Sequence, residues 1–137
     1  MPGFEVYDNR EKEAAIAVFE EGNVLFSHGF NGLRKKFHVQ EFNSMFERYF
    51  SVKHAISLSS GTAGLKTALK ALGIKSGDEV ITQGFNFIAT IEAIIDTGAS
   101  PVIAPIDENL NMDLEATEKL ISKKTKAIII VHMLGCP

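Results

Sequence analysis

Short apolar segments alternate with amphipathic segments from residue 54 onward. The apolar segments are four predicted strands, His54–Leu58, Glu79–Thr82, Pro101–Ala104 and Ala127–His132. Three predicted helices lie between them, Thr62–Leu72, Phe87–Thr97 and Asp113–Ser122. Because a helix connects each strand to the next, the strands are expected to run parallel. The alternation predicts an α/β fold, with a mostly parallel sheet flanked by helices.

The last apolar segment, Ala127–His132, is apolar at consecutive positions. This pattern is typical of a parallel strand that is covered on both faces. Such a strand needs further elements around it, and the chain ends at Pro137 soon afterwards. We therefore expect the sequence to be the first part of a larger domain.

Two further helices are predicted before the alternating region. Asp8 is expected to cap a helix that runs to about Glu21, with Glu11 completing a capping box. A second helix is indicated by apolar residues at steps of three and four, Val39, Phe42, Phe46 and Tyr49. An irregular segment that includes Ser27–Gly32 separates the two helices.

Composition excludes several classes of protein. The 137 residues carry a formal charge of −3, from 14 Lys and Arg against 17 Asp and Glu, so no nucleic-acid or polybasic membrane surface is expected. The single cysteine, Cys136, excludes an internal disulfide framework and fits a reducing cytosol. The N-terminus lacks the features of a signal peptide, and no apolar run is long enough to span a bilayer. A cytoplasmic location is the expectation.

The turn before the helix Thr62–Leu72 is rich in hydroxyl groups and glycine. Ser59, Ser60, Gly61 and Thr62 follow an apolar segment directly. Free backbone N–H groups, the helix dipole and these hydroxyls could bind a phosphate there. Serine and threonine are also the ordinary N-cap residues, so a plain helix start explains the same residues equally well. The turn alone leaves both interpretations open.

Other polar groups are assigned to structure rather than to a site. The alternating residues Asp107, Asn109, Asn111 and Asp113 lack the glycine of a calcium loop and are interpreted as a surface turn followed by a helix N-cap at Asp113. The four histidines, His28, His38, His54 and His132, show no metal-ligand spacing, so no metal site is predicted. His132 ends a predicted strand, where doubly wound folds build sites, but a structural role is favoured. Periodicity alone places Phe87 in the core.

Several linked motifs resemble one known family. They are Ser57–Leu69, Leu72–Thr82, Gly84–Thr90, Gly98–Val102 and Lys124–Gly135. In this order the chain resembles, over about Gln40 to Pro137, the N-terminal part of the DegT/DnrJ/EryC1/StrS family of pyridoxal-phosphate-dependent sugar aminotransferases. The resemblance implies part of a fold-type I large domain. Residues 1–50 would then be N-terminal helices and a loop, and residues 51–137 the first part of the large domain that binds the cofactor.

The resemblance also implies roles for four residues. Gly61, Thr62 and Ala63 would bind the phosphate of pyridoxal 5'-phosphate (PLP), Ala63 through its backbone N–H, and Phe87 would stack on the pyridine ring. For Phe87 the family position outweighs the core interpretation. The family's Schiff-base lysine and the aspartate that pairs with the pyridine nitrogen correspond to positions beyond Pro137. The catalytic residues are thus unknown, and the lysines of this chain are interpreted as surface charge.

The implied function is transfer of an amino group to a nucleotide-linked keto-sugar, with glutamate as donor, in the synthesis of cell-surface polysaccharides or amino sugars. A homodimer is implied, with Ser27–Gly32 near the cofactor or the partner chain. The chain by itself is expected to be inactive. Two alternatives are a PLP-dependent sugar dehydratase and a non-catalytic regulatory or scaffolding remnant.

Overall fold

The computed structural model describes residues 4–20, 29, 32–33 and 36–135. The chain divides into two structural units, Met1–Ser57 and Leu58–Pro137. The segment Ser27–Gly32 lies outside the described residues except for Gly29 and Gly32, and His28 and Cys136 lie outside them as well. The placement of a domain boundary at residue 51 stays a prediction.

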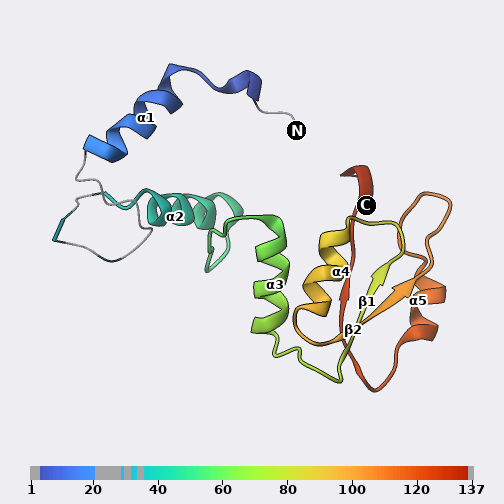
Figure 1. Cartoon of the computed structure of the whole chain (residues 1–137). Helices are drawn as coiled ribbons and strands as arrows, with labels where there is room; N and C mark the ends of the chain where they lie inside the picture. Colours follow the sequence, from blue (N-terminus) through green and yellow to red (C-terminus); the bar gives the residue numbers. More distant parts are fainter. Residues whose placement is uncertain (1–3, 21–28, 30–31, 34–35, 136–137) are drawn as a thin grey trace. The chain divides into compact units, whose positions relative to one another are not determined.

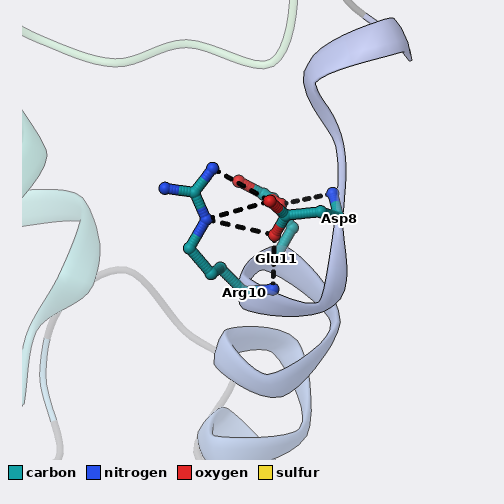
Figure 2. Close-up of polar contacts among 3 residues, drawn as sticks. All are labelled: Asp8, Arg10 and Glu11. Atoms are coloured by element: carbon teal, nitrogen blue, oxygen red, sulfur yellow. Dashed lines mark hydrogen bonds and ion pairs between the residues drawn. The ribbon is translucent and has the colours of Figure 1, made fainter.

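The first unit contains a 3₁₀ helix and two α-helices. They are η1 (Phe4–Val6), α1 (Asn9–Glu20) and α2 (His38–Phe50). The predicted capping box at the start of α1 is confirmed: Asp8 Oδ1 accepts from the Arg10 backbone N–H at 2.7 Å, and the Asp8 N–H donates to Glu11 Oε2 at 2.8 Å (Figure 2). The Arg10 guanidinium also bonds to Asp8, which lowers the pKa of that carboxyl group.

The predicted helix around Phe42 and Phe46 is confirmed as α2. Aromatic side chains stack along it, with ring centroids 6.0 Å apart for Phe42 and Phe46 and 4.4 Å apart for Phe46 and Phe50. These rings remain exposed in the structure. The spacing therefore predicted the helix and its apolar face correctly.

The predicted strand His54–Leu58 is wrong, because the described residues form no strand there. The Ala55 N–H donates instead to Glu47 Oε1 at 2.9 Å, and Ser57 Oγ donates to Asn43 Oδ1. Both acceptors are side chains of α2. An apolar composition favours a strand only when a neighbouring strand accepts its backbone hydrogen bonds, and here α2 takes part of that role.

The second unit has the predicted alternation of helices and strands (Figure 1). Its elements are α3 (Gly61–Ala71), β1 (Glu79–Gln83), α4 (Ile88–Ile95), β2 (Ser100–Ala104), α5 (Leu114–Leu120), β3 (Thr125–Ile129) and η2 (Met133–Gly135). All three strands are parallel, in the order β2-β1-β3. The predicted α/β fold with a parallel sheet is confirmed.

Helices cover the two faces of the central strand. On one face Val80 packs in a cluster with Leu69 of α3 and with Ala93 and Ile94 of α4. On the other face Ile81 packs with Met112 and with partly buried Leu120 of α5. Val80 and Ile81 are fully buried. The buried core is thus centred on β1.

The last strand differs from its prediction in its bounds. It ends at Ile129 rather than at His132, since the Val131 N–H donates to the side chain of Gln83 rather than to a strand carbonyl. One face of the strand is uncovered, since Ile128 is 42% exposed, which agrees with the expectation that such a strand needs further elements around it. β3 lies at the edge of the described sheet, where Ala127 and Ile129 pack on the cluster beneath α3 and α4 while Ile128 faces the other side.

None of the helices in the described part of the chain has the length and apolar character needed to cross a membrane.

Candidate functional site

The first turn of α3 presents two unpaired backbone N–H groups. Ser60 is the N-cap, with extended backbone, and its Oγ accepts from the Ala63 N–H at 3.1 Å. The Gly64 N–H bonds to the Ser60 carbonyl at 3.0 Å. No hydrogen bond among the described residues uses the N–H groups of Gly61 or Thr62. These two donors, together with the helix dipole, form a local site for an anion.

Of the three predicted phosphate-binding residues, Ala63 is the one whose backbone N–H is already hydrogen-bonded. Its N–H already has an acceptor in Ser60 Oγ. A phosphate could receive this N–H only by sharing it with the serine hydroxyl or by displacing that hydroxyl. The helix start is therefore an ordinary N-cap and a potential anion site at the same time, which explains why the sequence alone left both interpretations open.

Gly61 has no structural requirement to be glycine in the described residues. Its φ lies outside the left-handed region, and a Cβ built on it would meet no atom within 4 Å. The same is true of Gly64, one turn further along the helix. The absence of a side chain at Gly61 leaves open space beside the two unpaired N–H groups, where a ligand can approach the backbone closely.

Phe87 is not a core residue. It occupies the N-cap position of α4 and its side chain is 72% exposed. The interpretation from periodicity alone was wrong because the residue lies in the turn after β1, before the helix begins. Its ring is free to contact a planar ligand.

The start of α3 and Phe87 lie at the same end of the second unit. Helices α3 and α4 pack side by side (Figure 1), and Asp96, the C-cap of α4, pairs with Lys66 and Lys70 of α3 at 3.5 and 3.1 Å. Their C-terminal ends therefore lie together. Gly61 lies nine residues before Lys70 in α3, and Phe87 lies nine residues before Asp96 in α4. At about 1.5 Å per residue, Gly61 and Phe87 are each roughly 13 Å from the ion pair, toward the N-terminal end of their helix.

The same ion pair affects the titration of Asp96. The hydrogen bond from Lys70, and then the positive charge of Lys66, lower the pKa of this carboxyl group. Lys66 and Lys70 thus belong to the contact between the C-terminal halves of the two helices, and not to the end that carries Phe87.

The loop before α5 has the structural role predicted for its polar residues, whereas the structural role favoured for His132 stays a prediction. Asp107 Oδ1 accepts from the N–H groups of Asn109 and Asn111, which closes a surface turn, and Asp113 caps α5 by accepting from the Ala116 N–H. His132 lines an open groove of about 700 Å³ together with this turn. In the part of the chain that the structure describes, no cluster of three or more His, Cys, Asp or Glu side chains could hold a metal ion.

One group of buried polar residues was not singled out in the sequence. Thr82 and Gln83 are fully buried at the end of β1, and Asn86 hydrogen-bonds to both of them in the turn that leads to Phe87. The only signal in the sequence is a change from apolar to amide and hydroxyl side chains at the end of an apolar strand.

Taken together, the described residues at this end of the second unit offer groups that can bind a ligand. The unpaired N–H groups of Gly61 and Thr62 suit a phosphate, and the exposed ring of Phe87 suits a flat aromatic group. A phosphorylated pyridine such as PLP has both features, so the residues present fit this cofactor.

Comparison with known proteins agrees with this chemistry. Residues 20–137 match the model of the DegT/DnrJ/EryC1/StrS aminotransferase family. GDP-perosamine synthase of Vibrio cholerae is 40% identical over 114 residues, covering 82% of this chain and 31% of that protein. The spore coat polysaccharide biosynthesis protein SpsC of Bacillus subtilis is 48% identical over 98 residues, covering 71% of this chain and 25% of that protein.

A solved structure shows the same fold. The PMP form of a putative sugar aminotransferase from Streptococcus pneumoniae superposes with a TM-score of 0.83 at 26% identity, over 96% of this chain and 31% of that protein. The chain thus spans between about a quarter and a third of the length of these relatives. With the family model matched over most of its residues, the chain belongs to the DegT/DnrJ/EryC1/StrS aminotransferase family.

Proposed function

We propose that this protein works as a PLP-dependent aminotransferase that moves an amino group from glutamate to a keto-sugar carried on a nucleotide, in the synthesis of cell-surface polysaccharides or amino sugars. Family membership supports the aminotransferase part. The names of the relatives, a GDP-perosamine synthase and a spore coat polysaccharide protein, support the class of substrate and pathway.

The N-terminus of α3 takes the phosphate of the cofactor in this proposal. The N–H groups of Gly61 and Thr62 donate to phosphate oxygens, the Thr62 hydroxyl adds a third donor, and Ala63 contributes its N–H when Ser60 Oγ turns aside. Hydrogen bonds to a charged acceptor are stronger than neutral ones. The positive end of the helix dipole favours the same anion.

Phe87 holds the pyridine ring in this proposal. Its exposed face would stack on the ring and exclude water from that side. When bound, PLP supplies the electron sink for breaking bonds at the amino carbon, while the protein binds and orients it. The observation that carries the proposal is the placement of the unpaired Gly61 and Thr62 N–H groups and the exposed Phe87 ring at one end of two parallel helices.

Replacement of Thr62 by valine tests the phosphate site. In the full-length protein, Thr62→Val removes a hydrogen bond to a charged group and should weaken PLP binding by about 1.5–3 kcal/mol, or roughly 10- to 150-fold in Kd. Thr67→Val is the matched control, because Thr67 is an exposed threonine further along the same helix. Equal Kd values for Thr62→Val and the wild type would remove the phosphate assignment.

Quaternary structure and location complete the proposal. The working form is a cytoplasmic homodimer with composite active sites, as the family resemblance implies. Sedimentation velocity of the full-length protein should give a dimer. A strict monomer at micromolar concentration would contradict both the dimer and the composite active sites, while the roles proposed for Gly61, Thr62 and Phe87 would stand.

A further inference from the structure

The carboxyl end of β1 contains a polar cluster inside an otherwise apolar core. Its members are Thr82 and Gln83, both 0% exposed, and the half-buried Asn86. Burying amide and hydroxyl groups is unfavourable unless each is hydrogen-bonded. The partners of this cluster therefore indicate which parts of the fold it holds together.

Gln83 joins three separate segments. Its Nε2 donates to the Phe85 carbonyl at 3.1 Å, in the turn between β1 and α4, and to the Leu110 carbonyl at 3.3 Å, in the loop before α5. Its Oε1 accepts from the Val131 N–H at 3.2 Å, just after β3. One buried amide thus links three loops at one edge of the sheet.

Leu110, in the second of these loops, has an unfavourable backbone conformation. Its φ is +65°, in the left-handed region that residues other than glycine seldom adopt. The hydrogen bond from Gln83 Nε2 to the Leu110 carbonyl stabilises this conformation. Loss of the bond would release the loop to less strained conformations.

Asn86 anchors the residue next to Phe87. Its Nδ2 donates to Thr82 Oγ1 at 3.2 Å and to the Gln83 carbonyl. Thr82 Oγ1 in turn donates to the Ile129 carbonyl of β3 at 3.2 Å. The backbone on the N-terminal side of Phe87 is therefore fixed at Phe85 and at Asn86, although the Phe87 ring itself is mostly exposed.

We propose that Gln83 is a positioning residue that, together with Asn86, presets the Phe87 ring for the cofactor. This inference rests on the proposed function, in which Phe87 stacks on PLP. An exposed ring on a loose turn must be ordered when the ligand binds, whereas a ring on a preset turn has lost that freedom already. Gln83 acts through Phe87 and does not touch the cofactor.

A double-mutant cycle in the full-length protein tests this coupling. Gln83→Met keeps the length of the side chain and removes its three hydrogen bonds, and it should raise the PLP Kd about tenfold. In a Phe87→Ala background the same change should raise the Kd less than about twofold, because the ring it positions is absent. Thr117→Val is the control: it removes a buried hydrogen bond to the Asp113 carbonyl in α5, and the Kd should stay within about twofold of the wild type.

Amide hydrogen exchange of the protein without cofactor gives a second, independent measurement. Gln83→Met should speed exchange in the segments around Phe85, Leu110 and Val131 together, whereas Thr117→Val should leave them unchanged. If Gln83→Met does not fold, Asn86→Ala replaces it, with the same expectation of a smaller effect on Kd in the Phe87→Ala background.

The outcomes separate this inference from the proposed function. If Phe87→Ala weakens PLP binding but Gln83→Met does not, or if the two effects simply add, the function survives and the positioning role is refuted. If Phe87→Ala leaves the Kd unchanged, the stacking role and the positioning role both fail. Unchanged exchange at all three segments in Gln83→Met also refutes the positioning role.

Discussion

Two glycines in α3 allow the phosphate site to be tested without damaging the fold. Gly61 and Gly64 both have open space where a Cβ would be, and neither has a left-handed backbone. An alanine therefore fits at both positions. Only Gly61 lies beside the unpaired N–H groups at the start of the helix, so a methyl group there should interfere with a bound phosphate and one at Gly64 should not.

Both substitutions should raise the free energy of unfolding, but only Gly61→Ala should weaken PLP binding. Each replaces glycine by a better helix former and restricts the unfolded chain, which should raise the free energy of unfolding by about 0.4–1 kcal/mol. Gly61→Ala should also cost one hydrogen bond to the charged phosphate, about 1.5–3 kcal/mol, or a Kd increase of roughly 10- to 150-fold. Gly64→Ala should leave the Kd unchanged.

The assay combines urea unfolding with titration of PLP into the full-length protein freed of cofactor. The informative result is a Gly61→Ala protein that is at least as stable as the wild type and yet binds PLP poorly, because loss of folding then cannot explain the loss of affinity. Wild-type affinity in Gly61→Ala would refute the close approach of the phosphate to this backbone. Equal losses in both variants would show that the effect is not local to the first turn.

Three further results are expected. Ser60→Ala removes the cap on the Ala63 N–H and should lower stability by about 1 kcal/mol in urea unfolding, and an unchanged midpoint would contradict the capping role. Asp96→Asn should lower the free energy of unfolding of the second unit slightly at pH 7. The stability difference from the wild type should vanish as pH falls through the folded-state pKa of Asp96, because a carboxyl group with a lowered pKa stabilises the fold only while it is ionised. A stability difference that persists fully at pH 2 would exclude the ion pair as its cause. The purified chain Met1–Pro137, incubated with PLP, glutamate and a keto-sugar nucleotide, should form no 2-oxoglutarate, and sustained turnover would mean that one of its own lysines is catalytic.

Features that depend on a few neighbouring residues could be predicted from the sequence. The capping box of Asp8 and Glu11 and the cap of α5 by Asp113 formed as expected, and Ser60 caps α3 in the turn where the sequence left an N-cap as one of two interpretations. Each of these hydrogen bonds spans two or three residues, so the chemistry that forms it is visible within one turn of sequence. The same holds for α2, whose apolar spacing is a local pattern.

Features that depend on distant partners could not be predicted in the same way. The segment His54–Leu58 has the composition of a strand, yet its Ala55 N–H and Ser57 hydroxyl bond to α2. β3 stops at Ile129 because the Val131 N–H bonds to Gln83, 48 residues earlier in the chain. Strand pairing is a property of two segments, and apolar composition describes only one of them.

The residues of the candidate site also differ in how far they could be predicted from the sequence. The helix start at Gly61 and Thr62 is a local feature and could be predicted, but their assignment to a phosphate site came from the family resemblance and stays a prediction. The exposure of Phe87 required the actual position of the turn after β1. For Gln83 the only signal was the change from apolar to polar side chains at the end of the strand, and that change does not indicate burial. A glutamine at the end of a strand is usually a surface residue, and its burial depends on carbonyl and amide partners contributed by other loops.

The sheet topology explains why anion binding is expected at one helix start in particular. Because the strands are parallel, each connecting helix begins near the carboxyl edge of the sheet, so every helix directs its N–H groups toward that edge. The start of α5 is capped by the carboxylate of Asp113, which accepts from the Ala116 N–H and places a negative charge there that opposes an incoming phosphate. The start of α3 is capped by the neutral hydroxyl of Ser60, and the start of α4 has no side-chain cap. α3 and α4 run parallel, with Leu69 packed in one cluster with Ala93 and Ile94 and with Asp96 paired to Lys66 and Lys70, so their two positive ends lie together, and Phe87 is at that end.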